Sequence, residues 1–104
     1  MPVATINDHL VQVDEEGFLT DYDEWNEDLA RVLAAQIGIE LTEDHWKAIH
    51  FLRRDYKETG ETATLRRVTT VAGIPTKDLF TLFPKKPAKK MAYIAGLPKP
   101  RGCV

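Results

Sequence analysis

The sequence contains no serine and only one cysteine, Cys103, which is the last residue but one. The absence of serine excludes a serine nucleophile, and a single cysteine cannot form an internal disulfide, which excludes a disulfide-stabilised secreted scaffold. The glycine-rich motifs of P-loop and dinucleotide sites are missing as well. No secretory signal opens the chain, and no run approaches the roughly 20 apolar residues that span a membrane. These absences predict a cytoplasmic protein with no membrane partner.

The charges divide unevenly between the two halves of this 104-residue chain. Residues 1–52 contain 12 acidic and two basic residues, whereas residues 53–104 contain 12 basic and four acidic residues. This asymmetry predicts an acidic face and a basic face, with the basic face directed at an anionic partner. The basic face is expected to contain eight residues: Arg53, Arg54, Arg66, Arg67, Lys85, Lys86, Lys89 and Lys90.

The hydrophobic pattern predicts a mostly helical (α+β) domain over residues 1–96, a five-helix bundle-like fold with an N-terminal β-hairpin. In the hairpin, residues 9–13 form one strand, residues 14–17 the turn and residues 18–19 the start of the return strand. Two prolines and a glycine in residues 97–104 prevent a further helix, so this segment is predicted to be a flexible arm.

Capping residues and apolar spacing place the five helices. The predicted helices cover residues 24–37 with Asp23 as N-cap, 43–59 between Thr42 and Gly60, 64–72 before Gly73, 77–83 after the N-cap Thr76, and a last helix from Pro87 that ends at Gly96. Trp25 and Trp46 fall at the helical spacing of core residues. The third and fourth helices, over residues 64–83, have the spacing of a helix-turn-helix.

Cys103 is the candidate reactive group, because a thiol on a short arm can reach another protein's active site. Lys99 and Arg101 place positive charge near it and favour the reactive thiolate, whereas the terminal carboxylate acts in the opposite direction. Such a thiol can attack a persulfide or mixed disulfide, carry the sulfur away and transfer it to a second protein. The residues alone leave open an exposed cysteine in the tail that has no role.

Two other chemistries are weaker. Sequence-specific DNA binding by residues 64–83 is an alternative, but the second helix of that segment offers only Lys77, Asp78 and Thr81 as polar groups for base contacts. His45 and His50 lie five residues apart, not the four that place two ligands on one helical face. They are therefore interpreted as structural, and no metal or cofactor is expected.

The C-terminal third of the chain carries a specific pattern. It reads Leu82-Phe83-Pro84, then Pro87-Ala88-Lys89, then Ile94-Ala95-Gly96-Leu97-Pro98-Lys99-Pro100, and closes with Gly102-Cys103-Val104. This pattern resembles the DsrC/TusE family, which includes the gamma subunit associated with dissimilatory sulfite reductase. Weaker agreement extends upstream through residues 14–19, Trp25, residues 41–46 and residues 51–53. The resemblance covers nearly the whole chain from about residue 10.

The resemblance implies a sulfur carrier that holds a persulfide on Cys103, with Pro98, Pro100 and Gly102 setting the extension and hinge of the arm. It implies a TusBCD/DsrEFH-like donor protein, a thiouridylase or sulfite reductase-like acceptor, and a chain that is monomeric when free. Family members that serve sulfite reductase have a second arm cysteine eleven positions earlier, where this chain has Ala92. The connection after the third helix is also shorter than is usual in the family. A docking subunit without its own chemistry is a further alternative.

Overall fold

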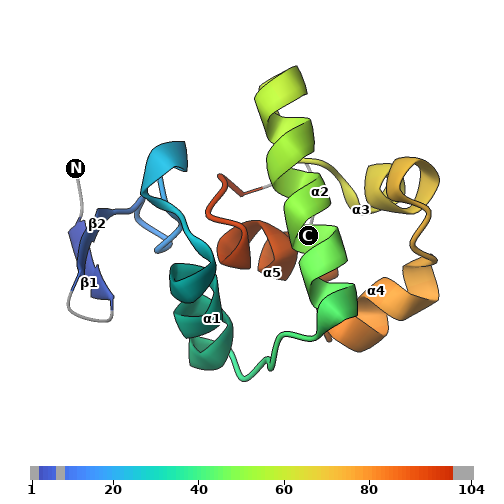
Figure 1. Cartoon of the computed structure of the whole chain (residues 1–104), viewed down its shortest axis with the longest axis horizontal. Coiled ribbons are helices and arrows are strands. Elements are labelled where there is room, and N and C mark those ends of the chain that lie inside the picture. The colour runs from blue at the N-terminus through green and yellow to red at the C-terminus, as the bar shows by residue number, and fades with distance from the viewer. Residues whose placement is uncertain (1–2, 7–8, 100–104) are drawn as a thin grey trace.

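The computed structural model describes residues 3–6 and 9–99 of the chain. The elements follow one another as β1 (Val3–Ile6), β2 (His9–Gln12), a 3-10 turn η1 (Tyr22–Glu24), α1 (Glu27–Gln36), α2 (Glu43–Thr59), α3 (Leu65–Arg67), a π-helical turn η2 (Val68–Ala72), α4 (Thr76–Leu82) and α5 (Pro87–Ile94). Figure 1 shows α2 in front of α5, with α1 on one side and α3 and α4 on the other. The predicted mostly helical fold with N-terminal β structure is confirmed.

The pairing of the N-terminal strands differs from the predicted hairpin. β2 pairs in antiparallel register with the preceding β1, Val3 facing Gln12 across the ladder. The predicted return at residues 18–19 is present but short, because it pairs with the end of β2 only through a bridge between Val13 and Leu19. Two backbone hydrogen bonds flank this bridge, from the Asp14 amide to the Phe18 carbonyl oxygen at 2.8 Å and from the Thr20 amide to the Gln12 carbonyl oxygen at 3.0 Å. The chain then leaves the sheet and enters η1, so residues 18–19 are too short a segment to extend the ladder.

α1 starts three residues later than predicted, because Asn26 caps it and Asp23 does not. The Asn26 side chain accepts a hydrogen bond from the Leu29 amide at 2.8 Å. Upstream, the Asp21 side chain accepts a hydrogen bond from the Asp23 amide at 3.0 Å and caps the N-terminus of η1. The two caps, Asp21 and Asn26, therefore divide the predicted helix into η1 and α1. Trp25 lies between them with an extended backbone conformation.

The ends of α2 and α5 agree with the sequence signals. α2 starts after the capping box of Thr42 and ends at Gly60, whose φ of 78° is left-handed. α5 has Pro87 at its first position, and the chain turns at Gly96 with φ 70°. The third helix is less regular than predicted, because residues 65–67 are α-helical and residues 68–72 form the π-helical turn.

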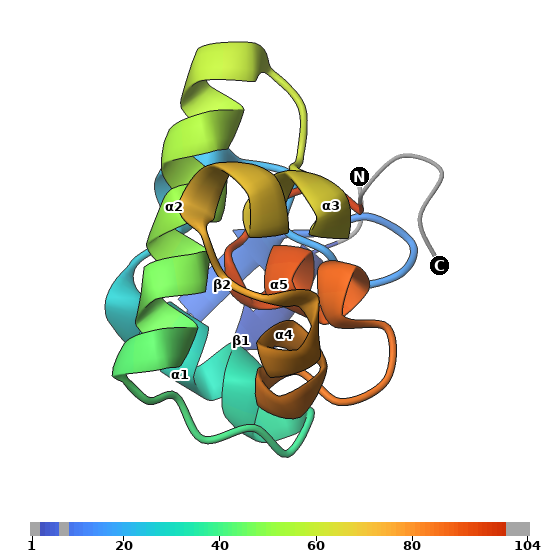
Figure 2. The ribbon, with the colours of Figure 1, turned by 90° about the vertical axis from the view of Figure 1, so that its right-hand side faces the viewer.

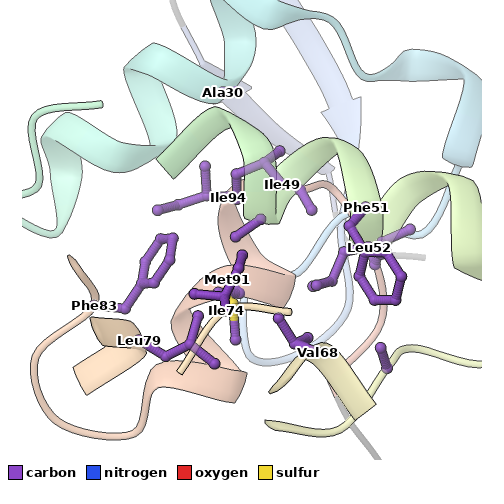
Figure 3. Close-up of a cluster of buried hydrophobic side chains, with 14 of the residues drawn as sticks. Ala30, Ile49, Phe51, Leu52, Val68, Ile74, Leu79, Phe83, Met91 and Ile94 are labelled. Atoms are coloured by element: carbon purple, nitrogen blue, oxygen red, sulfur yellow. The ribbon is translucent and has the colours of Figure 1, made fainter. Parts of the chain in front are cut away.

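The core lies between α2 and α5 (Figure 3). Ile49 and Leu52 of α2 and Met91 and Ile94 of α5 are all fully buried, and side chains of η2 and α4 close the cluster. Figure 2 shows α2 running along one side of the molecule with α5 and α4 beside it. Within residues 3–6 and 9–99, we find no helix with the length and apolar character needed to cross a bilayer.

Candidate functional site

The structure describes two of the six predicted site residues, Pro98 and Lys99, and both are exposed. Pro100, Arg101, Gly102 and Cys103 lie outside the described residues. The site can therefore be built from the end of α5 as far as Lys99, four residues before Cys103. The division between domain and arm at residue 97 stays a prediction.

The chain beyond α5 begins inside the core. Leu97 is fully buried, and its amide donates to the carbonyl oxygen of Ala92 at 3.0 Å. Exposure begins only at Pro98. Burial of a leucine side chain contributes about 2 kcal/mol, so Leu97 attaches the start of the segment firmly to the domain.

Arg53 holds the last turn of α5 from the middle of α2. Its Nη1 donates to the Ala95 carbonyl oxygen at 2.8 Å, and its Nη2 donates to the Tyr22 carbonyl oxygen at 2.9 Å. Its Cζ lies 3.8 Å from the ring centroid of Tyr22 and 4.1 Å from that of Trp25. The guanidinium of Arg53 therefore makes cation–π contacts with two rings and also donates hydrogen bonds to two backbone carbonyl oxygens.

The buried position of Arg53 corrects the expectation that it belongs to the basic surface. The residue is 9% exposed. Burial lowers the pKa of its guanidinium, against the opposing effects of Tyr22 and Asp23. Two aromatic faces and two carbonyl oxygens replace the water that a surface arginine would bind. These contacts offset the free-energy cost of burying the charge of Arg53.

Trp25 makes a second attachment at the same place. Its Nε1 donates to the Ile94 carbonyl oxygen at 2.9 Å. A Cβ built on Gly96 would lie 2.5 Å from Cδ1 of Trp25, so the indole packs against the backbone where α5 ends. The carbonyls at a helix C-terminus have no partner within the helix, and here Arg53 and Trp25 supply two of the missing donors. Trp25 is thus a core-packing residue, as predicted, although it lies outside α1.

The last described residues are held by polar contacts. Thr62 Oγ1 donates to the Pro98 carbonyl oxygen at 2.8 Å. The ammonium of Lys99 lies 3.5 Å from Glu16 Oε1, and the ammonium of Lys89 lies 3.7 Å from the same oxygen. Exposed ion pairs of this kind contribute at most about 1 kcal/mol each. Together these contacts hold the chain at Lys99 beside the turn at residues 14–17.

The histidines take part in packing and capping. Nδ1 of His45 accepts from the Thr42 amide at 3.1 Å, and Nε2 lies 2.8 Å from the Leu82 carbonyl oxygen, which requires the proton to be on Nε2. His50 stacks on Trp46 and contacts Glu27 at 3.1 Å. In the part of the chain that the structure describes, no three His, Cys, Asp or Glu residues group as metal ligands would.

The chain is similar to known proteins over nearly its whole length. The family described as "DsrC like protein" matches residues 5–104. The chain belongs to this DsrC-like family. It is 40% identical over 101 residues to a protein named Sulfurtransferase TusE from Pectobacterium atrosepticum, a match covering 90% of this chain and 93% of that protein.

Solved structures of the family superpose closely on this chain. The NMR structure of Allochromatium vinosum DsrC is 39% identical, with a TM-score of 0.82 and coverage of 98% of this chain and 97% of that one. The oxidised gamma subunit of dissimilatory sulfite reductase (DsrC) from Archaeoglobus fulgidus is 37% identical, with a TM-score of 0.76 and coverage of 99% and 100%. Family membership and the sulfurtransferase relatives support a sulfur-carrier role for this chain.

Nothing in these comparisons favours the DNA-binding alternative, and the structure of residues 64–83 gives it no support. Nε and Nη2 of Arg67 bind the two oxygens of Asp55 at 2.8 and 2.7 Å, and Asp55 is only 4% exposed. The pair raises the pKa of Arg67. The same segment exposes two large apolar side chains, Val71 at 56% and Phe80 at 49%, which cannot read base edges by hydrogen bonding.

The structure also describes Ala92, where the resemblance implies a second cysteine in the members that serve sulfite reductase. Ala92 lies on α5 and is fully buried. The contacts that Arg53, Trp25 and Tyr22 make at the end of α5 were not predicted from the sequence. The sequence contains one indication of these contacts, which is that Tyr22 and Trp25 stand in the acidic segment at residues 21–25. Two aromatic side chains at these positions do not fit the start of a helix with Asp23 as its N-cap.

Proposed function

We propose that the chain carries sulfane sulfur as a persulfide on Cys103, accepting it from one protein and delivering it to another. The observation that carries the proposal is the position of the chain's single cysteine, four residues beyond the anchored Lys99 in a member of the DsrC-like family. Relatives named sulfurtransferase support it. The structure supports it through the contacts that attach residues 94–99 to the domain.

The transfer chemistry needs no added oxidant or reductant. The Cys103 thiolate attacks the terminal sulfur of a donor persulfide, a new S–S bond forms on Cys103, and the donor's S–S bond breaks to release the donor thiolate. The terminal sulfur keeps its proton. An acceptor thiolate then repeats the same attack on the Cys103 persulfide and restores the Cys103 thiolate.

The other arm residues have supporting roles in the proposal. Lys99 and Arg101 favour the thiolate by their charge, and Pro98, Pro100 and Gly102 set the direction and hinge of the segment. Covalent geometry places Cys103 within about 14 Å of Lys99, since each residue spans at most about 3.5 Å. Any partner that exchanges sulfur with Cys103 must therefore dock close to the base of the arm.

The donor in this proposal is a TusBCD/DsrEFH-like protein, and the acceptor is a thiouridylase or a sulfite reductase-like enzyme. Support comes from relatives named sulfurtransferase TusE and gamma subunit of dissimilatory sulfite reductase. We place the exchange in the cytoplasm, where a reducing pool keeps a lone thiol available. The free chain is taken to be monomeric.

Loading of Cys103 can be tested on the purified full-length chain. Incubation with glutathione persulfide should add one sulfur, about 32 Da by intact mass, and dithiothreitol should remove it. The Cys103→Ser variant should show no gain. An unchanged wild-type mass, or an equal gain in the variant, would contradict the proposal. A docking subunit without chemistry would still bind its partner after this substitution, whereas a carrier would lose transfer.

A further inference from the structure

A groove of about 530 Å³ lies between α5, the α4–α5 connection and the turn at residues 14–17. Its apolar part includes Phe18, Ile37 and Tyr93, and the rings of Phe18 and Tyr93 meet edge to face at 5.6 Å. The phenol of Tyr93 donates to Gln36 Oε1 at 2.8 Å, and burial raises the pKa of Tyr93, so the ring stays neutral. In Figure 2 the α4–α5 connection runs along the edge of the molecule.

Four lysines surround this apolar part: Lys85, Lys86, Lys89 and Lys90. The ammonium of Lys90 donates to the Pro84 carbonyl oxygen, and Lys89 shares Glu16 with Lys99. Among the described residues, Lys85 and Lys86 contact no carboxylate, and both are exposed. With Glu16 as the single acidic residue lining it, the groove carries a net positive charge beside the half-buried side chains of Ile37 and Tyr93.

The backbone of the two unpaired lysines is itself unusual. Lys85 and Lys86 have φ values of 60° and 51°, and within the described residues no other side-chain-bearing position has positive φ. A lysine in this left-handed conformation lowers the stability of the folded protein relative to a glycine at the same position. Adjacent like charges add repulsion. The domain's own packing does not need lysine at either position, since both side chains are exposed. Strain retained at such residues points to recognition of a ligand.

We propose that this lysine-rimmed groove docks an acidic segment of a partner protein, in which carboxylates flank aliphatic or aromatic side chains. The carboxylates would meet Lys85 and Lys86, and the apolar side chains would cover the half-buried Ile37 and Tyr93. Because Glu16 bridges Lys89 of the groove and Lys99 of the arm, the docked segment lies beside the base of the arm. The partner is a sulfur donor or acceptor only if the proposed function holds; the groove's ligand chemistry does not depend on it.

The test uses ¹⁵N-labelled full-length chain and an eight-residue probe peptide, Glu-Glu-Leu-Glu-Phe-Glu-Glu-Leu. Titration at low salt should shift the amide signals of Phe18, Lys85, Lys89 and Tyr93. Lys85→Glu/Lys86→Glu should weaken binding at least tenfold. The matched control Lys57→Glu/Lys77→Glu makes the same charge change on α2 and α4, away from the groove, and should change binding less than twofold.

A second variant separates recognition from folding. Lys85→Gly/Lys86→Gly keeps the left-handed backbone and should raise Tm while weakening peptide binding at least fivefold. Probe peptides with Gln for Glu, or with Ser for Leu and Phe, should each bind at least fivefold more weakly. Unchanged binding by the glycine variant would overturn the proposal. So would tighter binding at the same lysines by a single-stranded RNA octamer.

Failure of the groove and failure of the carrier role give different results. Loading of Cys103 by glutathione persulfide does not require docking, so Lys85→Glu/Lys86→Glu should still gain about 32 Da. If the peptide fails to bind but loading persists, the groove proposal is wrong and the carrier role stands. If loading fails while the peptide binds through Lys85 and Lys86, the reverse holds.

Discussion

Nη1 of Arg53 lies 2.8 Å from the carbonyl oxygen of Ala95, which joins the middle of α2 to the last turn of α5. The contact is buried and crosses 42 residues of sequence. It places a cation under the start of the C-terminal segment, between the rings of Tyr22 and Trp25. The position of the segment that follows α5 thus depends on the packing of Arg53, Tyr22 and Trp25.

Substitution of Arg53 should destabilise the domain strongly. Arg53→Met removes two hydrogen bonds and both cation–π contacts and leaves the carbonyls of Ala95 and Tyr22 without these donors. We expect a loss of about 2–4 kcal/mol in the free energy of unfolding, measured by urea denaturation. Arg54→Met is the control, because Arg54 is exposed, and should cost under about 0.5 kcal/mol. Equal effects of the two substitutions would contradict the assigned role of Arg53.

Gly96 and Gly73 offer a matched pair that separates steric contact from backbone strain. Both have positive φ, 70° and 76°. A Cβ at Gly96 meets Trp25 Cδ1 at 2.5 Å, whereas one at Gly73 meets nothing within 4 Å. Gly73→Ala should therefore cost about 1 kcal/mol, the price of the left-handed conformation, and Gly96→Ala about 2–4 kcal/mol. Thermal unfolding followed by tryptophan fluorescence checks both, and similar Tm values for the two variants would refute the close packing of Trp25.

Tyr93 predicts a dependence of stability on alkaline pH. Burial raises the pKa of Tyr93 in the folded chain, so the unfolded chain releases this proton at lower pH than the folded chain does. Its contribution to stability is complete below the ordinary tyrosine pKa of about 10 and is lost as pH rises through the folded value. Urea denaturation between pH 8 and 11 should show stability falling more steeply in wild type than in Tyr93→Phe. Parallel curves for the two chains would be inconsistent with a pKa raised by the partial burial of the phenol.

Lys99 predicts an effect on the reactivity of the thiol. If its charge favours the Cys103 thiolate, Lys99→Gln should slow alkylation by iodoacetamide at pH 7 by about two- to threefold, and added salt should reduce the difference. Lys57→Gln, an exposed change on α2, serves as the control and should leave the rate unchanged. A rate in Lys99→Gln equal to that of wild type would remove Lys99 from the account of thiol reactivity.

Much of the helical framework could be predicted because local signals determine it. Thr42 and Gly60 bound α2, and Pro87 and Gly96 bound α5, through capping and turn preferences that need no tertiary contact. The start of α1 could not be predicted as well, because Asp21, Asp23 and Asn26 are all good caps and their competition is decided by packing. Strand pairing is equally hard to predict from the sequence, because β2 can pair with the segment before it, β1, or with the segment after it at residues 18–19.

The candidate site was only partly visible in the sequence. Cys103 and the proline-rich segment around it stand out by residue type and spacing. The burial of Arg53 does not, because it arises from residues 31 and 42 positions away. A charged residue on an amphipathic helix is usually exposed, and only the tertiary arrangement of Tyr22, Trp25 and Ala95 makes this one a buried attachment.

The most direct test of the central claim is the mass of the C-terminal peptide during sulfur transfer. After exposure to glutathione persulfide and proteolysis without reductant, the peptide containing Cys103 should be about 32 Da heavier, and every other peptide unchanged. Addition of an acceptor thiol before proteolysis should return that peptide to its original mass and place the sulfur on the acceptor. A Cys103 peptide that never gains the sulfur, or gains it and does not release it to any acceptor thiol, would contradict the role of the chain as a sulfur carrier.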